Sequence, residues 1–282
     1  MKVVTFAKGN KLPRPGVLES EKVYDITEYG FRSTLELIEG DAEALNAIRG
    51  LANSKASYAL DEIHLLAPIP RPPRIFAVGL NYQEHAAESK MAVQKVPTVF
   101  MKLSSSVTGP DTEVILPKNS AQPDYEAELA VVIGKPGYRI AARDWEQHVF
   151  GYTIVNDVSA RDVQLATSQW TLGKSFPTFT PLGPAIVTRD EIADPHALDI
   201  RLAIDGEVLQ NSNTKDLIFR IPQLIEYISS LTPLEAGDVI STGTPPGVGL
   251  GRTPQRWLRD KEEMVITIAG LGELRNRTRA EV

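Results

Sequence analysis

The chain has 282 residues, of which 42% are hydrophobic, and it carries 30 lysines and arginines against 36 aspartates and glutamates, a formal charge of -6. Its size and composition are typical of a globular protein with one large domain or two. An acidic chain without a basic run disfavours nucleic acid and anionic membranes as partners. The absence of cysteine excludes disulfides, thiolate catalysis and cysteine-bound metals, so any metal should be held mainly by oxygen.

The chain shows no pattern for a membrane or for export. No apolar run reaches the ~18 residues of a spanning helix, and residues 1–6 follow a strand pattern instead of that of a signal peptide. The four histidines lie in different segments, which disfavours a histidine-rich metal site. We therefore expect a cytoplasmic protein.

The first 70 residues are predicted to form a small N-terminal α/β domain. Short strand patterns separated by turn residues occupy residues 2–27, and helical patterns follow at Thr34–Ile38 and Asp41–Leu51. Four prolines then fall within residues 67–74, which denies both a helix and a central strand. We place the boundary there, between a small domain at 1–70 and the main domain at 71–282.

A histidine and a glutamate share one face of the next predicted helix. This helix follows a strand pattern at residues 75–79, with Asn81 as its predicted N-cap. His85 and Glu88 lie three residues apart in it, and an imidazole beside a carboxylate can act as a general base. An incidental hydrogen bond on the helix surface is the alternative, and these two residues alone favour it because a histidine and a glutamate often occur at this spacing by chance.

Two acids occupy one face of a predicted strand at Asp124–Gly134. Because side chains alternate along a strand, Glu126 and Glu128 point the same way, opposite to an apolar face. Two like charges about 4 Å apart repel by roughly 4 kcal/mol at an effective dielectric constant near 20. The segment therefore indicates either a solvated strand face or a patch on which a cation sits.

A third acid ends a later strand pattern. Asp157 follows residues 150–155, and the end of a strand is a usual place for a functional side chain. Together with Glu126 and Glu128 it would form an all-oxygen site, which favours Mg²⁺, Mn²⁺ or Ca²⁺ over zinc.

Three polar residues in the next segments are candidates for ligand binding. Arg161 and Gln164 share a helix face, and a guanidinium with an amide suits a carboxylate or keto group, although a fold-stabilising salt bridge of Arg161 remains an alternative. The loop that follows, rich in glycine and proline, presents Lys174 as a fixed cation.

Later patterns complete the fold. We predict a hairpin about the turn Asp205–Gly206 and an amphipathic helix at Ile221–Leu231. The loop at residues 243–251 combines glycines, which allow a ligand to approach the backbone, with prolines that stiffen it.

Four motifs between Asp124 and Pro245 follow one another along the chain in an order that resembles that of the fumarylacetoacetate hydrolase family, and in particular of its acylpyruvase-like members. The resemblance covers roughly residues 74–280 and implies an α+β, β-rich fold in which a mixed β-sandwich roll forms the catalytic domain. It also implies a homodimer. The residues that carry it are Asp124–Glu128, Asn156–Asp157 with Ser159–Gln164, Gly173–Phe176 and Thr242–Pro245.

The same resemblance implies roles for single residues. The acids would hold a metal, the helix with His85 and Glu88 resembles a lid segment whose dyad activates water, and other side chains would contact the substrate. The residues implied are Glu126, Glu128 and Asp157 as metal ligands, His85, Glu88 and Lys174 in catalysis, and Arg161, Gln164 and Thr244 in substrate binding.

The function implied is that of a Mg²⁺-dependent hydrolase, with Mn²⁺ or Ca²⁺ as alternative metals. It would cleave a carbon-carbon bond in a 2,4-dioxo acid, such as an acylpyruvate or fumarylpyruvate, through a metal-stabilised enolate. Decarboxylation of oxaloacetate, or isomerisation or hydration of an unsaturated 2-oxo acid, would use the same enolate. A catalytically silent metal- or ligand-binding protein is the alternative outside enzymes.

Overall fold

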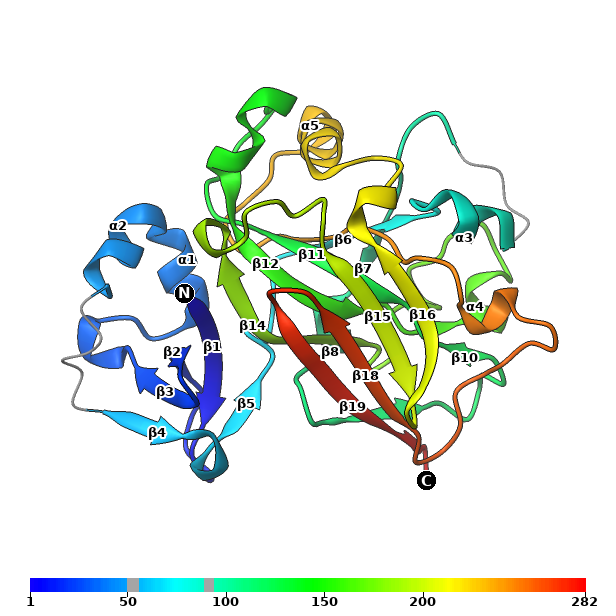
Figure 1. The fold of residues 1–282 in the computed structure, drawn as a ribbon, viewed down its shortest axis with the longest axis horizontal. Coiled ribbons are helices and arrows are strands. Elements are labelled where there is room, and N and C mark those ends of the chain that lie inside the picture. The colour runs from blue at the N-terminus through cyan, green and yellow to red at the C-terminus, as the bar shows by residue number, and fades with distance from the viewer. Residues whose placement is uncertain (50–55, 89–93) are drawn as a thin grey trace.

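The computed structural model describes residues 1–49, 56–88 and 94–282, and it is rich in strands (Figure 1). The strands form two large sheets and a short two-stranded sheet, and the helices of the described part are short. The predicted α+β, β-rich class is confirmed. No helix of the described part is long and apolar enough to cross a membrane.

The larger sheet contains the strand that carries the acidic motif. Its strand order is β4-β3-β2-β1-β14-β12-β11-β17-β6-β7, with β5 added on β1 and β8 on β14. The strands are β1 (Lys2–Ala7), β2 (Arg14–Glu19), β3 (Lys22–Asp25), β4 (Ser57–Ala59), β5 (His64–Leu66), β6 (Ile75–Gly79), β7 (Thr98–Lys102), β8 (Val107–Thr108), β11 (Ala127–Ile133), β12 (Val149–Asn156), β14 (Thr180–Thr188) and β17 (Val239–Ser241).

The second sheet has the order β16-β15-β18-β19-β9 and packs one face on the main core. The predicted hairpin joins β15 to β16, and Asp205 and Gly206 both have positive φ, of 48° and 84°, as a tight hairpin turn requires. The strands are β9 (Glu113–Leu116), β15 (Asp199–Ile204), β16 (Glu207–Asn213), β18 (Glu263–Ile268) and β19 (Gly272–Ala280), and β10 (Pro123–Asp124) pairs separately with β13 (Ser159–Ala160).

The predicted helices are present, although two of them differ in length. The amphipathic helix α5 spans the predicted residues and buries Leu224, Ile225 and Ile228. The second predicted helix ends at Ala47, and Leu51 lies outside the described residues. The helices are α1 (Thr34–Glu39), α2 (Asp41–Ala47), α3 (Gln83–Glu88), α4 (Arg161–Gln164) and α5 (Ile221–Leu231).

The N-terminal segment, blue in Figure 1, is joined to the rest of the molecule by sheet pairing. Strand β1 pairs with β14, with Val3 opposite Ile186. Val3 and Ile38 also share one hydrophobic cluster with Val132 and Ile186. The segment thus shares strands and core with the region that follows, and a boundary near residue 70 stays a proposal.

Strand β11 lies inside the molecule with both faces covered. Leu129 and Val131 pack in the main core cluster, whereas Ala130 and Val132 pack in the cluster shared with the N-terminal segment. Glu128 therefore lies on a covered face, and its side chain is only 1% exposed. This excludes the solvated strand face that the sequence left open.

Candidate active site

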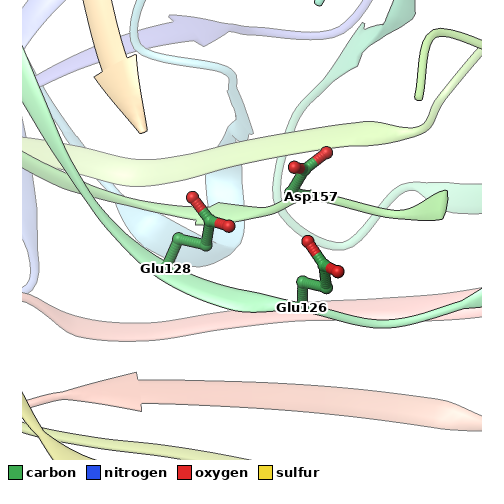
Figure 2. Close-up of side chains that lie close together, drawn as sticks. All are labelled: Glu126, Glu128 and Asp157. Atoms are coloured by element: carbon green, nitrogen blue, oxygen red, sulfur yellow. The ribbon is translucent and has the colours of Figure 1, made fainter. Parts of the chain in front are cut away.

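The three acids singled out in the sequence meet in space (Figure 2). Glu126 directly precedes β11, Glu128 lies within it, and Asp157 directly follows β12. The two strands are antiparallel, with Ala127 opposite Asn156, and the Asp157 amide donates to the Glu126 carbonyl at 2.9 Å. One carboxylate oxygen from each acid lies within 4.8 Å of the others, and all three residues are buried.

The local backbone differs from the prediction at one point. We expected one continuous strand at Asp124–Gly134, but β10 ends at Asp124 and β11 begins at Ala127. The break arises because β10 pairs with β13 while β11 pairs with β12. Asn156 bridges it, since its side-chain oxygen accepts a hydrogen bond from the Glu126 amide at 3.0 Å.

Two buried cations contact Glu126. Lys174 Nζ lies 2.6 Å from Glu126 Oε2 and 2.8 Å from Asp157 Oδ2. Arg161 donates to Glu126 Oε1 at 2.6 Å. Burial alone would raise the pKa of Glu126, but Lys174 and Arg161 outweigh it and hold that pKa far below its usual value.

Glu128 forms no ion pair with any residue that the structure describes. It accepts hydrogen bonds from Ser241 Oγ at 2.5 Å and from the Gly243 amide at 2.9 Å. Burial, followed by the charges of Asp157 and Glu126, raises its pKa well above the usual value. Glu128 is thus a buried acid beside two like charges, and no ion pair with a described residue offsets its own charge.

This arrangement fits a divalent cation. Glu126, Glu128 and Asp157 supply hard oxygen ligands from three positions, as Mg²⁺ and Mn²⁺ prefer. Asp157 Oδ1 already lies 2.6 Å from Lys102 Nζ, but a carboxylate oxygen has two lone pairs and can hold a second partner. An added cation would also relieve the repulsion that raises the pKa of Glu128.

His85 and Glu88 form a pair within α3. His85 Nδ1 lies 2.9 Å from Glu88 Oε1, and the Gly247 amide donates to Glu88 Oε2 at 2.9 Å. An ionised Glu88 accepts the Nδ1 proton, which leaves Nε2 as the basic nitrogen. His85 is 5% exposed and lines the same pocket as Glu126, so the pair is not an incidental surface contact.

Asn81 does not cap α3, contrary to the prediction. Its side chain donates to the carbonyls of Phe219 and Thr242 and accepts from the Phe219 amide, at 2.9, 2.7 and 2.7 Å. These bonds tie the start of the helical segment to the loop beside the acids. No local pattern predicts these bonds, because the partners are 138 and 161 residues away along the chain.

Most of the predicted site residues line a single pocket. Asp157 and Glu88 are absent from its lining, but they pair with Lys174 and His85, which belong to it. The predicted residues that line the pocket are His85, Glu126, Glu128, Arg161, Gln164, Lys174 and Thr244.

The sequence predicts either that Arg161 binds a ligand together with Gln164 or that it forms a salt bridge that stabilises the fold, and its contacts are compatible with both. It donates to Gln164 Oε1 at 2.9 Å, which keeps the pair on one face of α4. It also pairs with Asp124 at 2.9 Å, and Asp124 accepts from the Gly249 amide at 2.7 Å. Arg161 is therefore part of a structural salt bridge and of the pocket wall.

Two residues near the acids escaped the sequence analysis. Lys102, fully buried at the end of β7, approaches Asp157 and donates to the Lys174 carbonyl. Burial, with a contribution from Lys174, lowers its pKa. Asp124 lies in the acidic motif itself, which was a signal for it, whereas a lysine closing an ordinary strand pattern gave none for Lys102.

The β-rich fold and its carboxylate-lined pocket agree with the comparison with known families. The family model described as "Fumarylacetoacetate (FAA) hydrolase C-terminal" matches residues 74–279. The chain belongs to this family, as its motifs indicated.

Three proteins that are similar to this chain carry names with different activities. Human "Oxaloacetate tautomerase FAHD2A, mitochondrial" is 45% identical over 86% of this chain and 77% of its own. Maleylpyruvate hydrolase from Sphingobium sp. SYK-6, solved with manganese(II) and pyruvate, is 31% identical over the full length of both chains, with a TM-score of 0.86. A 5-carboxymethyl-2-hydroxymuconate delta-isomerase from Mycobacterium smegmatis is 32% identical over both full chains, with a TM-score of 0.80.

These relatives are named as enzymes that act on small molecules, but their reactions differ. The human relative carries a mitochondrial location in its name, so the comparisons do not confirm a cytoplasmic location for this chain. Homodimer formation likewise stays a prediction.

Proposed function

We propose that the protein is a divalent-metal-dependent enzyme that interconverts the keto and enol forms of a small 2-oxo acid of the oxaloacetate class. The observation that carries this proposal is a cluster of three acids, two of which line one pocket together with two cations and an oriented histidine. The name of the human relative supports the choice of reaction.

The metal would be held by Glu126, Glu128 and Asp157. When bound, Mg²⁺ or Mn²⁺ would supply a Lewis acid that favours the enolate form of the substrate. The manganese and pyruvate in the Sphingobium structure support this choice of cofactor and of substrate head group. Calcium remains an alternative because it accepts the same ligands.

His85 is the proposed proton carrier. Glu88 keeps the proton on Nδ1, so Nε2 can take a proton from the carbon next to the ketone and return it to the enolate oxygen. Keto and enol forms differ only in the position of this proton, and no water is consumed.

The cations and polar groups of the pocket would bind and orient the substrate. Lys174 and Arg161 are held in place by the acids, and their positive charges would offset the charge that develops on the enolate. Gln164 and Thr244 line the same pocket and can bond substrate oxygens.

Hydrolytic cleavage of a 2,4-dioxo acid, the reaction predicted from the sequence, is the second candidate. The His85–Glu88 pair favours it, because an oriented base can equally take a proton from an attacking water. The Sphingobium relative, named a hydrolase, supports it as well.

A substrate panel separates the candidates. With Mg²⁺ or Mn²⁺ present, we expect fast ketonisation of enol-oxaloacetate, measured by the loss of its ultraviolet absorbance, and no activity after chelator treatment. Faster cleavage of an acylpyruvate would favour the hydrolase, and release of CO₂ the decarboxylase. A protein that binds metal and oxalate but converts none of these compounds would contradict an enzymatic function.

A further inference from the structure

Gln210 is a buried amide that connects the two large sheets at the site. It lies on β16 of the smaller sheet and is 1% exposed. Its side chain reaches β11 of the larger sheet and the loop after β17. A polar side chain buried this deeply needs hydrogen-bond partners, and Gln210 has three.

The three partners fix the orientation of the amide. The Ala127 amide, which lies between Glu126 and Glu128, can only donate, and it donates to Gln210 Oε1 at 2.9 Å. The Pro245 carbonyl can only accept, and it lies 2.8 Å from Gln210 Nε2. Exchanging oxygen and nitrogen would leave both backbone groups unpaired, so only one orientation satisfies them.

The orientation of the Gln210 amide determines whether the Thr244 hydroxyl donates or accepts the hydrogen bond between them. Gln210 Nε2 carries only donors, and it lies 2.8 Å from Thr244 Oγ1, so the threonine oxygen accepts this bond. The hydroxyl proton of Thr244 therefore points elsewhere. Thr244 is 2% exposed, lines the pocket with Glu126, and donates to none of the residues that the structure describes.

We propose that Gln210 is a positioning residue that makes Thr244 a hydrogen-bond donor to an oxygen of the bound 2-oxo acid. The proposal rests on the proposed function, because it takes the pocket ligand to be such an acid. A hydroxyl that must accept from Gln210 has its proton left for an anionic oxygen, and a hydrogen bond to a charged group is among the stronger ones.

The test is a double-mutant cycle on Gln210 and Thr244, in which the affinities for substrate and for oxalate are measured. Gln210→Glu keeps the size of the side chain and an oxygen for the Ala127 amide, but a carboxylate makes Thr244 donate to it. We expect the KM for substrate and the Kd for oxalate, measured with saturating Mg²⁺, to rise about 10- to 100-fold. The value of kcat should change less than about threefold.

The same change in a Thr244→Val background should have no further effect on the Kd, because the donor is already gone. Gln147→Glu, on the exposed 3-10 helix at Ala142–His148, is the matched control and should leave both values unchanged. Melting temperatures of all variants report any loss of folding.

Two results would overturn the inference alone. One is an equal rise in Kd with and without the Thr244 hydroxyl, and the other is an unchanged Kd in folded Gln210→Glu. If the unmodified protein binds oxalate in no metal-loaded state, the proposed function fails and this inference fails with it.

Discussion

Two buried carboxylates, one in the N-terminal segment and one at the site, have opposite electrostatic environments. Asp25 accepts from Thr27 twice, at 2.9 and 2.6 Å, and from Arg14 at 2.8 Å. Burial alone would raise its pKa, but these partners lower it below the usual value. The pKa of Glu128 is instead raised, by burial and then by Asp157 and Glu126.

The opposite pKa shifts distinguish an acid that stabilises the fold, Asp25, from an acid placed to bind a ligand, Glu128. Asp25 has a full set of donors and a cation, so its charge is satisfied within the protein. Glu128 has two donors but neighbours of its own charge, an arrangement that costs stability until a cation arrives. Such groups are usual at functional sites.

The largest expected effect comes from Glu128→Gln. We expect activity to fall about 1000-fold, because a ligand of the proposed metal is lost. The metal-free variant should nevertheless melt at the same temperature as the metal-free parent or higher, since one repelling charge is gone. Differential scanning calorimetry after chelator treatment checks this, and a clear drop in melting temperature would place Glu128 among the acids that hold the fold.

The stability difference between metal-free Glu128→Gln and the metal-free parent should depend on pH. Because the folded-state pKa of Glu128 lies above its unfolded value, its contribution to stability falls as pH rises from about 4.3 through the folded pKa. Below pH ~4.3 the carboxyl is protonated in both states and costs nothing. Metal-free Glu128→Gln should therefore gain most over the parent at the upper end of this range, as urea unfolding would show.

His85→Ala sharpens the comparison by separating proton transfer from metal binding. We expect activity to fall by about 10² to 10⁴ while the affinity for Mn²⁺ is unchanged, since the imidazole is not among the proposed ligands. Steady-state rates and metal titration measure the two effects. His64→Ala, at an exposed position, is the control. Full activity in His85→Ala would remove it as the proton carrier.

The smallest expected effect comes from Asp25→Asn. We expect a loss of about 1 to 3 kcal/mol of unfolding free energy at pH 7 without loss of activity, because bonds to a buried anion are weakened. The folded-state pKa of Asp25 is depressed, so its stabilisation is present above its unfolded pKa of about 3.9 and disappears as pH falls through the folded pKa. Asp61→Asn, exposed in the same segment, should stay within about 0.5 kcal/mol of the parent at pH 7.

Local patterns in the sequence predicted the parts of the fold that local forces decide. The helix Ile221–Leu231 and the hairpin at Asp205–Gly206 follow from spacing and turn chemistry over a few residues. Alternation along an expected continuous strand placed Glu126 and Glu128 on one face, and they are neighbours although that strand is broken before Ala127.

What the sequence could not predict depends on pairing between distant segments. The join of β1 to β14 brings residue 3 opposite residue 186. Lys102 acts on Asp157, and Gln210 on Thr244, only because the strands that carry them pack beside the acids. Local patterns in one sequence do not predict contacts between segments that are far apart along the chain.

The most direct test is a calorimetric titration of the metal-free protein with Mn²⁺ at pH 7, beside Asp157→Asn under the same conditions. We predict one saturable site per chain in the parent, with affinity reduced at least about tenfold in the variant because one of three oxygen ligands is neutralised. An absence of binding in the parent, or equal affinity in the two proteins, would contradict the assignment of these acids as a metal site.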